Sequence, residues 1–214
     1  MDGLLDLINS DMGRQIISGV SQQSGASQNQ TSDVLSMALP VLMGAMRKNA
    51  STPQGAQGLL GALSDNKHSG SILDNLGDLF QGGVDQSVMD DGAGILGHVL
   101  GGRQQNVENA LSQKSGVDAS TVSQIIKIAA PILMGYLGKQ QRSQGVSDTN
   151  GLGSLLEGVM GAQQSSRQNQ SLIEQLIDAD GDGSIIDDIA GMAMGTQKKR
   201  GGLGGLLGGL FRKR

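Results

Sequence analysis

The clearest pattern in the chain is a run of apolar positions that recurs every three to four residues and occurs twice. Residues 20–49 and 111–140 each keep a helical period of apolar side chains for about three turns. The two stretches align without a gap at an offset of 91 residues, and 11 of the 30 aligned positions are identical. This identity indicates an internal duplication. The sequence therefore predicts two related helical halves, each built on one long helix.

Each long helix carries a proline inside its apolar pattern. Pro40 and Pro131 occupy equivalent positions, and both are followed by the residues Leu-Met-Gly after one β-branched residue. Proline removes one backbone donor, but the apolar period resumes in phase after it, so we expect a kink and not a helix end. Ser27 and Asp118 are the expected N-caps. We expect the two long helices to pack against each other about a pseudo-twofold axis.

Shorter amphipathic segments surround the two long helices. We expect Asp11 and Ser71 to cap two of these segments, and Gly25 to stop the helix before the first long one. No segment combines β-branched alternation with turn dipeptides, so the predicted fold class is all-α. The short helices are predicted at residues 3–8, 12–23, 58–63, 71–80, 87–100, 103–113 and 152–160.

The pattern divides the chain into four parts. The first helical repeat covers residues 1–83, and the second covers residues 84–162. A helix-loop-helix with an Asp-rich loop covers residues 163–195, and we find no counterpart for it in the first repeat. The basic tail, residues 196–214, is expected to be disordered, because six of the ten residues at 201–210 are glycine.

These motifs resemble a known bacterial family. The short amphipathic first helix, the turn SxxSG, the helix with P-[VI]-LMG and the glycine-rich second half are similar to the domain of unknown function 937, which is related to the YidB-like proteins. The resemblance covers residues 1–195, including the duplication. It implies an all-helical bacterial protein. It brings no established activity and transfers no catalytic residue to this chain.

Composition limits the core and the available chemistry. Only three of 214 residues are aromatic and ten are methionine, so the core must consist of aliphatic side chains. We expect modest stability and help from a protein partner or from self-association. The absence of cysteine excludes disulfides, thiolate nucleophiles and cysteine-based zinc sites. No signal peptide is recognised and no run approaches the roughly 18 apolar residues of a membrane span, so we expect a cytoplasmic protein.

An Asp-rich loop at residues 178–188 is the strongest sign of a chemical function. Carboxylates alternate at its first, third and fifth positions and glycine stands at the sixth, as in EF-hand loops that surround calcium with oxygens. The loop departs from that pattern at its twelfth position, where Ile189 replaces glutamate, so a nearby aspartate would have to close a shortened loop. The alternative is an acidic turn that caps the next helix. The candidate calcium ligands are Asp178, Asp180, Asp182, Ser184, Asp187 and Asp188.

No residue pattern indicates a catalytic site. The two histidines, His68 in a polar loop and His98 on a helix surface, are not spaced with a serine or an acid as in known nucleophilic sites. The glycine-rich pieces lack the strand and the lysine of a phosphate-binding loop. We identify no small-molecule substrate. We therefore predict a non-enzymatic structural, assembly or interaction protein.

Charge is unevenly distributed along the chain. All 20 acidic residues and ten of the 16 basic residues precede Lys198, whereas the last 17 residues carry six basic residues and no acid. Such a tail can lie on an anionic membrane surface, contact a protein partner, or simply keep the protein in solution. Nucleic acid is a poor fit, because stacking aromatics are absent. The main alternative function is thus a peripheral membrane-associated factor that acts through this tail.

Overall fold

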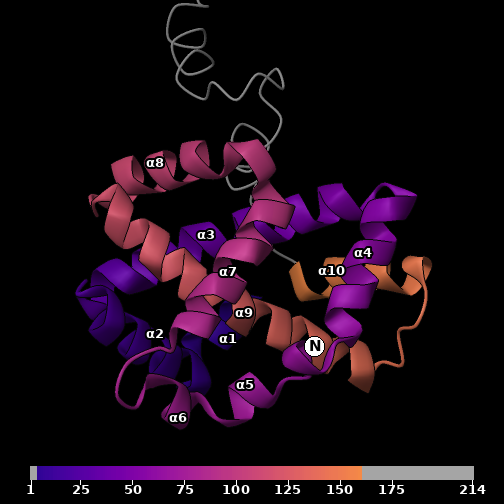
Figure 1. Ribbon diagram of the computed structural model, residues 1–214, viewed down its shortest axis with the longest axis horizontal. Coiled ribbons are helices and arrows are strands. Elements are labelled where there is room, and N and C mark those ends of the chain that lie inside the picture. Colours follow the sequence, from indigo (N-terminus) through magenta and orange to yellow (C-terminus); the bar gives the residue numbers. More distant parts are fainter. Residues whose placement is uncertain (1–3, 161–214) are drawn as a thin grey trace, which may run out of the picture.

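The computed structural model describes residues 4–160, which include both long helices and the shorter helices around them (Figure 1). Within this range every regular element is helical, so the predicted all-α class is confirmed there. In chain order the elements are α1 (Leu4–Asn9), α2 (Asp11–Ser24), α3 (Gln28–Ala50), α4 (Pro53–Ser64), η1 (Asn66–His68), α5 (Ser71–Asp74), α6 (Leu76–Phe80), α7 (Gln86–Leu100), η2 (Gly101–Arg103), α8 (Gln104–Ser115), α9 (Ala119–Ser143) and α10 (Thr149–Met160).

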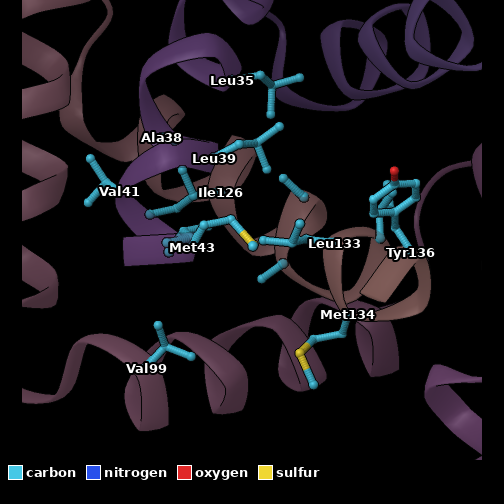
Figure 2. Close-up of a cluster of buried hydrophobic side chains, with 14 of the residues drawn as sticks. Leu35, Ala38, Leu39, Val41, Met43, Val99, Ile126, Leu133, Met134 and Tyr136 are labelled. Atoms are coloured by element: carbon cyan, nitrogen blue, oxygen red, sulfur yellow. The ribbon is translucent and has the colours of Figure 1, made fainter. Parts of the chain in front are cut away.

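The two long helices α3 and α9 pack directly against each other, as the sequence predicted. Figure 2 shows Leu35, Ala38 and Leu39 of α3 beside Ile126 and Leu133 of α9. One hydrophobic cluster joins buried side chains of both repeats. The two repeats therefore share a core in the described part of the chain.

Helix α9 occupies the inside of this core. It contacts α2, α3, α4, α5, α7, α8 and α10. Its length and its mean hydropathy of 1.3 over 18 residues would suffice to cross a membrane, although we expected no such run from the sequence. In this fold 78% of that window is buried. Contacts with neighbouring helices therefore account for its apolar character.

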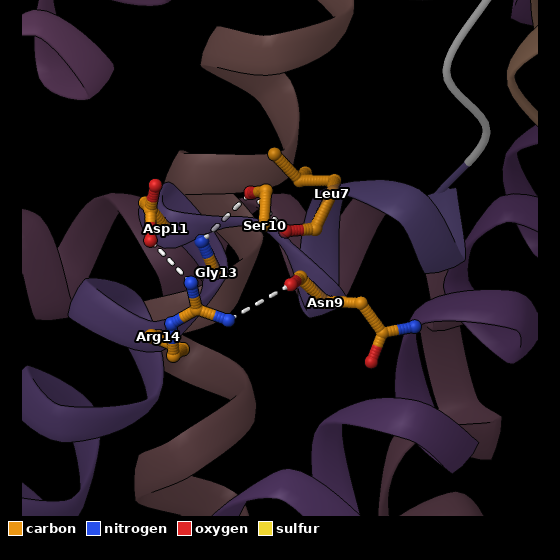
Figure 3. A network of polar contacts seen from close by, with 6 residues as sticks. All are labelled: Leu7, Asn9, Ser10, Asp11, Gly13 and Arg14. Carbon is orange, nitrogen blue, oxygen red and sulfur yellow. Dashed lines mark hydrogen bonds and ion pairs between the residues drawn. The ribbon is translucent and has the colours of Figure 1, made fainter.

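The predicted caps or boundaries of three helices were wrong. The N-cap of α2 is Ser10 and not Asp11: the Ser10 hydroxyl accepts a hydrogen bond from the Gly13 amide at 3.1 Å (Figure 3). Asp11 instead lies in the first turn, where its charge suits the helix dipole, and it pairs with Arg14.

Helix α4 begins five residues earlier than predicted. Pro53 stands at its start, where a missing amide is harmless, and the Thr52 hydroxyl accepts from the Gly55 amide at 3.1 Å. The segment 49–57 is therefore largely helical and not a loop.

The single helix predicted at residues 71–80 is two short helices, α5 and α6. Asn75 interrupts them with φ −119° and ψ 32°. Ser71 does not act as the N-cap; Gly70 precedes α5 in a left-handed conformation (φ 96°) and provides no side-chain cap.

Residues related by the offset of 91 form the same turn before each long helix. Gly25 and Gly116 end their helices with φ values of 75° and 69°. The Ser21 hydroxyl donates to the Ala26 carbonyl at 2.7 Å, and the Ser112 hydroxyl donates to the carbonyl of the equivalent residue at 2.6 Å. The stop predicted at Gly25 is confirmed.

The predicted N-caps of the two long helices are confirmed, but their chemistry differs. Ser27 forms a capping box with Gln30. Asp118 accepts hydrogen bonds from the hydroxyls of Ser120 and Thr121 and from the Thr121 amide. These bonds, that of Ser120 first, lower the pKa of Asp118 from 3.8 to about 2. The cap of α9 is therefore a carboxylate at neutral pH.

Glycine permits the closest approach between α7 and α9. A Cβ atom on Gly92 would lie 1.9 Å from the Lys127 carbonyl oxygen, whereas a Cβ atom on Gly94 would meet no atom within 4 Å. Gly92 is buried and Gly94 is exposed. The two glycines of one helix thus have opposite roles: the first allows contact between backbones, and the second faces open space.

We expect Gly92→Ala to lower the free energy of unfolding by about 2 kcal/mol or more, because the backbones of α7 and α9 must separate. Gly94→Ala is the matched control and should raise it by about 0.5–1 kcal/mol, because alanine loses less backbone entropy in a helix. Urea unfolding followed by circular dichroism measures both. Equal effects of the two substitutions would contradict the close contact at Gly92.

Candidate functional site

The predicted calcium loop lies outside the described residues. This applies to each of its candidate ligands, Asp178, Asp180, Asp182, Ser184, Asp187 and Asp188. Within residues 4–160 no group of three or more histidine, cysteine, aspartate or glutamate side chains gathers in a way that could hold a metal ion. The candidate site of the described part is therefore sought among its buried polar groups.

A buried polar cluster lies where η1 meets α7 and α9. His68 ends η1 and is only 7% exposed. Its Nδ1 lies 2.8 Å from the Ala62 carbonyl oxygen, and its Nε2 lies 3.4 Å from Oδ2 of Asp91 on α7. The imidazole thus links the end of α4 to a helix of the second repeat.

Arg142 of α9 completes the polar cluster from the other side. Its guanidinium group donates to the His68 carbonyl oxygen at 3.2 Å and to the Asp65 carbonyl oxygen at 3.1 Å. A longer bond of 3.4 Å reaches the Ser64 carbonyl oxygen. These carbonyls lie at the end of α4 and in the residues just after it, where a helix leaves acceptors unpaired, so one cation satisfies several of them.

The preceding residue of α9, Gln141, is also part of the cluster. Its amide nitrogen donates to the Ser64 hydroxyl at 3.1 Å and to the Val146 carbonyl oxygen at 3.0 Å. Its amide oxygen is buried without a hydrogen-bond partner among the described residues. The side chain therefore joins α4 to the connector that leads from α9 to α10.

Close backbone contact holds the cluster in place. A Cβ atom on Gly138 of α9 would lie 1.9 Å from the His68 carbonyl oxygen. Only glycine at this position lets η1 approach α9 so closely. Arg142, one turn further along α9, then reaches the same carbonyl oxygen.

The geometry of His68 fits a structural role better than proton transfer. Both of its ring nitrogens face protein oxygens, so neither is directed to a substrate. The Ser64 hydroxyl donates to the Leu60 carbonyl oxygen at 2.8 Å, whereas the partners of the imidazole are the Ala62 carbonyl oxygen and Asp91. The cluster can join the two repeats, but it does not assemble a nucleophile with a base.

The sequence placed His68 in a polar loop, whereas in the structure it ends the short helix η1 and is buried. The partners of His68 are distant in sequence: Asp91 is 23 residues away and Arg142 is 74 residues away. The spacing of residues near His68 in the sequence does not indicate such contacts. The prediction for His98 is confirmed, because this residue is exposed on α7 with Nδ1 2.8 Å from the Gly94 carbonyl oxygen.

An apolar cavity of about 30 Å³ lies between α1, α2, α3 and α9. Leu7, Leu35 and Leu133 are among the residues that line it. Because its walls are almost entirely apolar, it provides no groups to orient a polar substrate. Its size marks it as a packing defect of the core and not as a ligand site.

One protein family matches most of this chain. The family model described as "Bacterial protein of unknown function (DUF937)" matches residues 6–140 and 146–213. The chain belongs to this family. No curated protein and no solved structure matches the chain. The resemblance stated from the motifs is thereby confirmed, whereas the relation to YidB-like proteins stays a prediction.

The family match has one consequence for the candidate sites of this DUF937 chain. The match extends to residue 213 and so includes both the Asp-rich loop and the basic tail. The description of the family names no activity, so it assigns no role to the polar cluster or to the loop.

We expect His68→Ala to lower the free energy of unfolding by about 2–3 kcal/mol, because it leaves a cavity and removes a buried hydrogen bond. The chain's other histidine provides the control: His98→Ala should change stability by less than about 0.5 kcal/mol. Chemical unfolding of both variants gives the comparison. A mild effect of His68→Ala, equal to that of His98→Ala, would refute the structural role of the cluster.

Proposed function

We propose that this DUF937 chain is a non-catalytic scaffold protein whose C-terminal Asp-rich loop binds calcium. The observation that carries the proposal is the alternation of Asp178, Asp180 and Asp182 followed by Gly183. Three carboxylates so close together repel one another unless a cation offsets their charge. The buried polar cluster adds support for a non-catalytic role, since its histidine is engaged on both nitrogens.

Calcium would act on the protein through linkage. An ion that binds only the ordered loop stabilises that state as its concentration rises above the dissociation constant. Ser184 would contribute its backbone carbonyl, and Asp187 or Asp188 would close the shortened loop. The bound state would then present the segment to a protein partner or to a second copy of the chain.

The proposed scaffold includes the duplication of the long helices and a kink at each of their prolines. Pro40 and Pro131 both lie inside continuous helices, α3 and α9. The equivalent turns before these helices and the direct contact between them support a pseudo-twofold arrangement. We also place the protein in the cytoplasm, which its lack of cysteine supports.

Calorimetric titration of the full chain with calcium tests the proposal. We expect binding heat for the unchanged chain and an affinity reduced by about tenfold or more in Asp180→Ala, which removes a central ligand. Asp85→Ala is the matched control, because Asp85 is exposed and its side chain makes no cap hydrogen bond. Absence of heat, or equal affinity in both variants, would reject a calcium site in the loop.

A second candidate function rests on the tail. Lys198–Arg200 and Arg212–Arg214 bracket a stretch that contains four leucines and Phe211. Basic residues near an anionic bilayer contribute about 1 kcal/mol each, and the apolar residues add contact with the acyl boundary. The chain would then be a peripheral membrane-associated factor.

Vesicle flotation distinguishes this second function from the first. With phosphatidylserine vesicles at low salt, we expect the full chain to float and a form ending at Thr196 to remain at the bottom. Neutral phosphatidylcholine vesicles are the control, and raised salt should release the full chain, because screening weakens surface charge. Equal flotation of both forms would exclude the tail as the membrane-binding element.

A further inference from the structure

The short helix α5 docks on the C-terminal half of α9 through a glycine and a lysine. Ile72 lies over Gly135: a Cβ atom on this glycine would be 2.5 Å from Cγ2 of Ile72. One turn later, Nζ of Lys139 donates to Oδ1 of Asp74 at 2.8 Å. We call Gly135 and Lys139 of α9, spaced as Gly-x-x-x-Lys, the receiving surface. The docked segment, α5, contacts it with the aliphatic Ile72 and, two positions later, the acidic Asp74.

The same receiving surface occurs on α3. Gly44 and Lys48 are the offset-91 equivalents of Gly135 and Lys139, and both residue types are identical. Gly44 is half-buried and Lys48 is exposed at its surface. The long helix of the first repeat therefore has the residues that receive α5 in the second.

The docked segment also occurs a second time in the chain. Residues 71–78 read SILDNLGD and residues 171–178 read SLIEQLID, an ungapped match at an offset of 100. Three positions are identical, and four others exchange one aliphatic for another, aspartate for glutamate, or asparagine for glutamine. Residues 171–178 thus have a counterpart in the first repeat, although we expected none for residues 163–195.

The contacts of the other helices indicate where this second segment binds. Helix α2 contacts α9, and its equivalent α8 contacts α3. Likewise α4 contacts α9, and α10, which follows the second long helix as α4 follows the first, contacts α3. Each of these four helices thus contacts the long helix of the other repeat as well as that of its own. Because α5 contacts α9, its equivalent belongs on α3.

We propose that residues 171–176 dock on the C-terminal half of α3, with Leu172 over Gly44 and Glu174 beside Lys48. The charges are complementary, as they are for Asp74 and Lys139. The docking would fix the beginning of the Asp-rich loop, since Asp178 follows the segment directly. It does not depend on calcium binding, so either proposal can fail without the other.

Disulfide formation in the full chain tests the docking, and the lack of native cysteine leaves no competing thiol. The described contact supplies the reference pair, Gly135→Cys with Ile72→Cys. A Cβ atom on Gly135 would be 3.9 Å from Cβ of Ile72, a separation suited to a disulfide. The test pair is Gly44→Cys with Leu172→Cys. We expect both pairs to oxidise within the monomer at rates within about threefold of each other.

Two further pairs show whether the test pair reports docking or chance encounter. Gly44→Cys with Ile173→Cys shifts the register by one residue, and Gly94→Cys with Leu172→Cys uses an open glycine on α7. We expect both to oxidise at least about tenfold more slowly, because a docked segment fixes the effective concentration of one thiol pair. Equal rates for the test pair and these two controls, or disulfides only between molecules, would overturn the proposal.

A second measurement keeps the proposal testable if Gly44→Cys unfolds the protein. A short bismaleimide should join Lys48→Cys to Glu174→Cys as efficiently as it joins the reference pair Lys139→Cys and Asp74→Cys. Circular dichroism of the reduced variants establishes that they are folded. Crosslinking of the reference pair without crosslinking of the test pair would count against docking on α3.

Discussion

The long helix α9 lies inside the described fold, and its neighbours are positioned by contact with it. Residues 128–138 of this helix are buried without interruption. An aliphatic helix can be covered on all sides only if other helices approach closely, and glycine allows this at three points: Gly92 of α7, and Gly135 and Gly138 of α9 itself. At these three points a larger residue would clash with the neighbouring element, so the close packing around α9 needs glycine there.

Burial of α9 also determines where polar groups are found inside the molecule. At Gly138 the backbone of η1 comes so close to α9 that the His68 side chain is buried and must find partners in the protein, while the exposed Arg142 donates to the His68 carbonyl oxygen. Thr31 of α3 lacks such a partner: its buried hydroxyl makes no hydrogen bond among the described residues. At the equivalent position of α9 stands Val122, an isosteric residue with no hydroxyl to satisfy.

In our proposal, the same arrangement would connect the long helices to the Asp-rich loop. Helix α5 uses Gly135 and Lys139 on α9, and the matching pair on α3 offers the equivalent surface to residues 171–176. A calcium loop that starts on such a surface would have its first ligand held by the scaffold. The duplication would then serve two purposes, a symmetric core and a fixed entry to one functional loop.

The amino-acid sequence by itself determined the helical class, the two long helices, their N-caps Ser27 and Asp118, and the family. These properties depend on periodicity and on side chains that bond within a few residues, so they can be read locally. Only the tertiary structure decided that His68 is buried, that Asn75 divides the segment 71–80, and which glycines touch another helix. The burial of His68 and the glycine contacts depend on residues 23 to 74 positions apart, which meet only when α9 is enclosed, so no local sequence pattern indicates them.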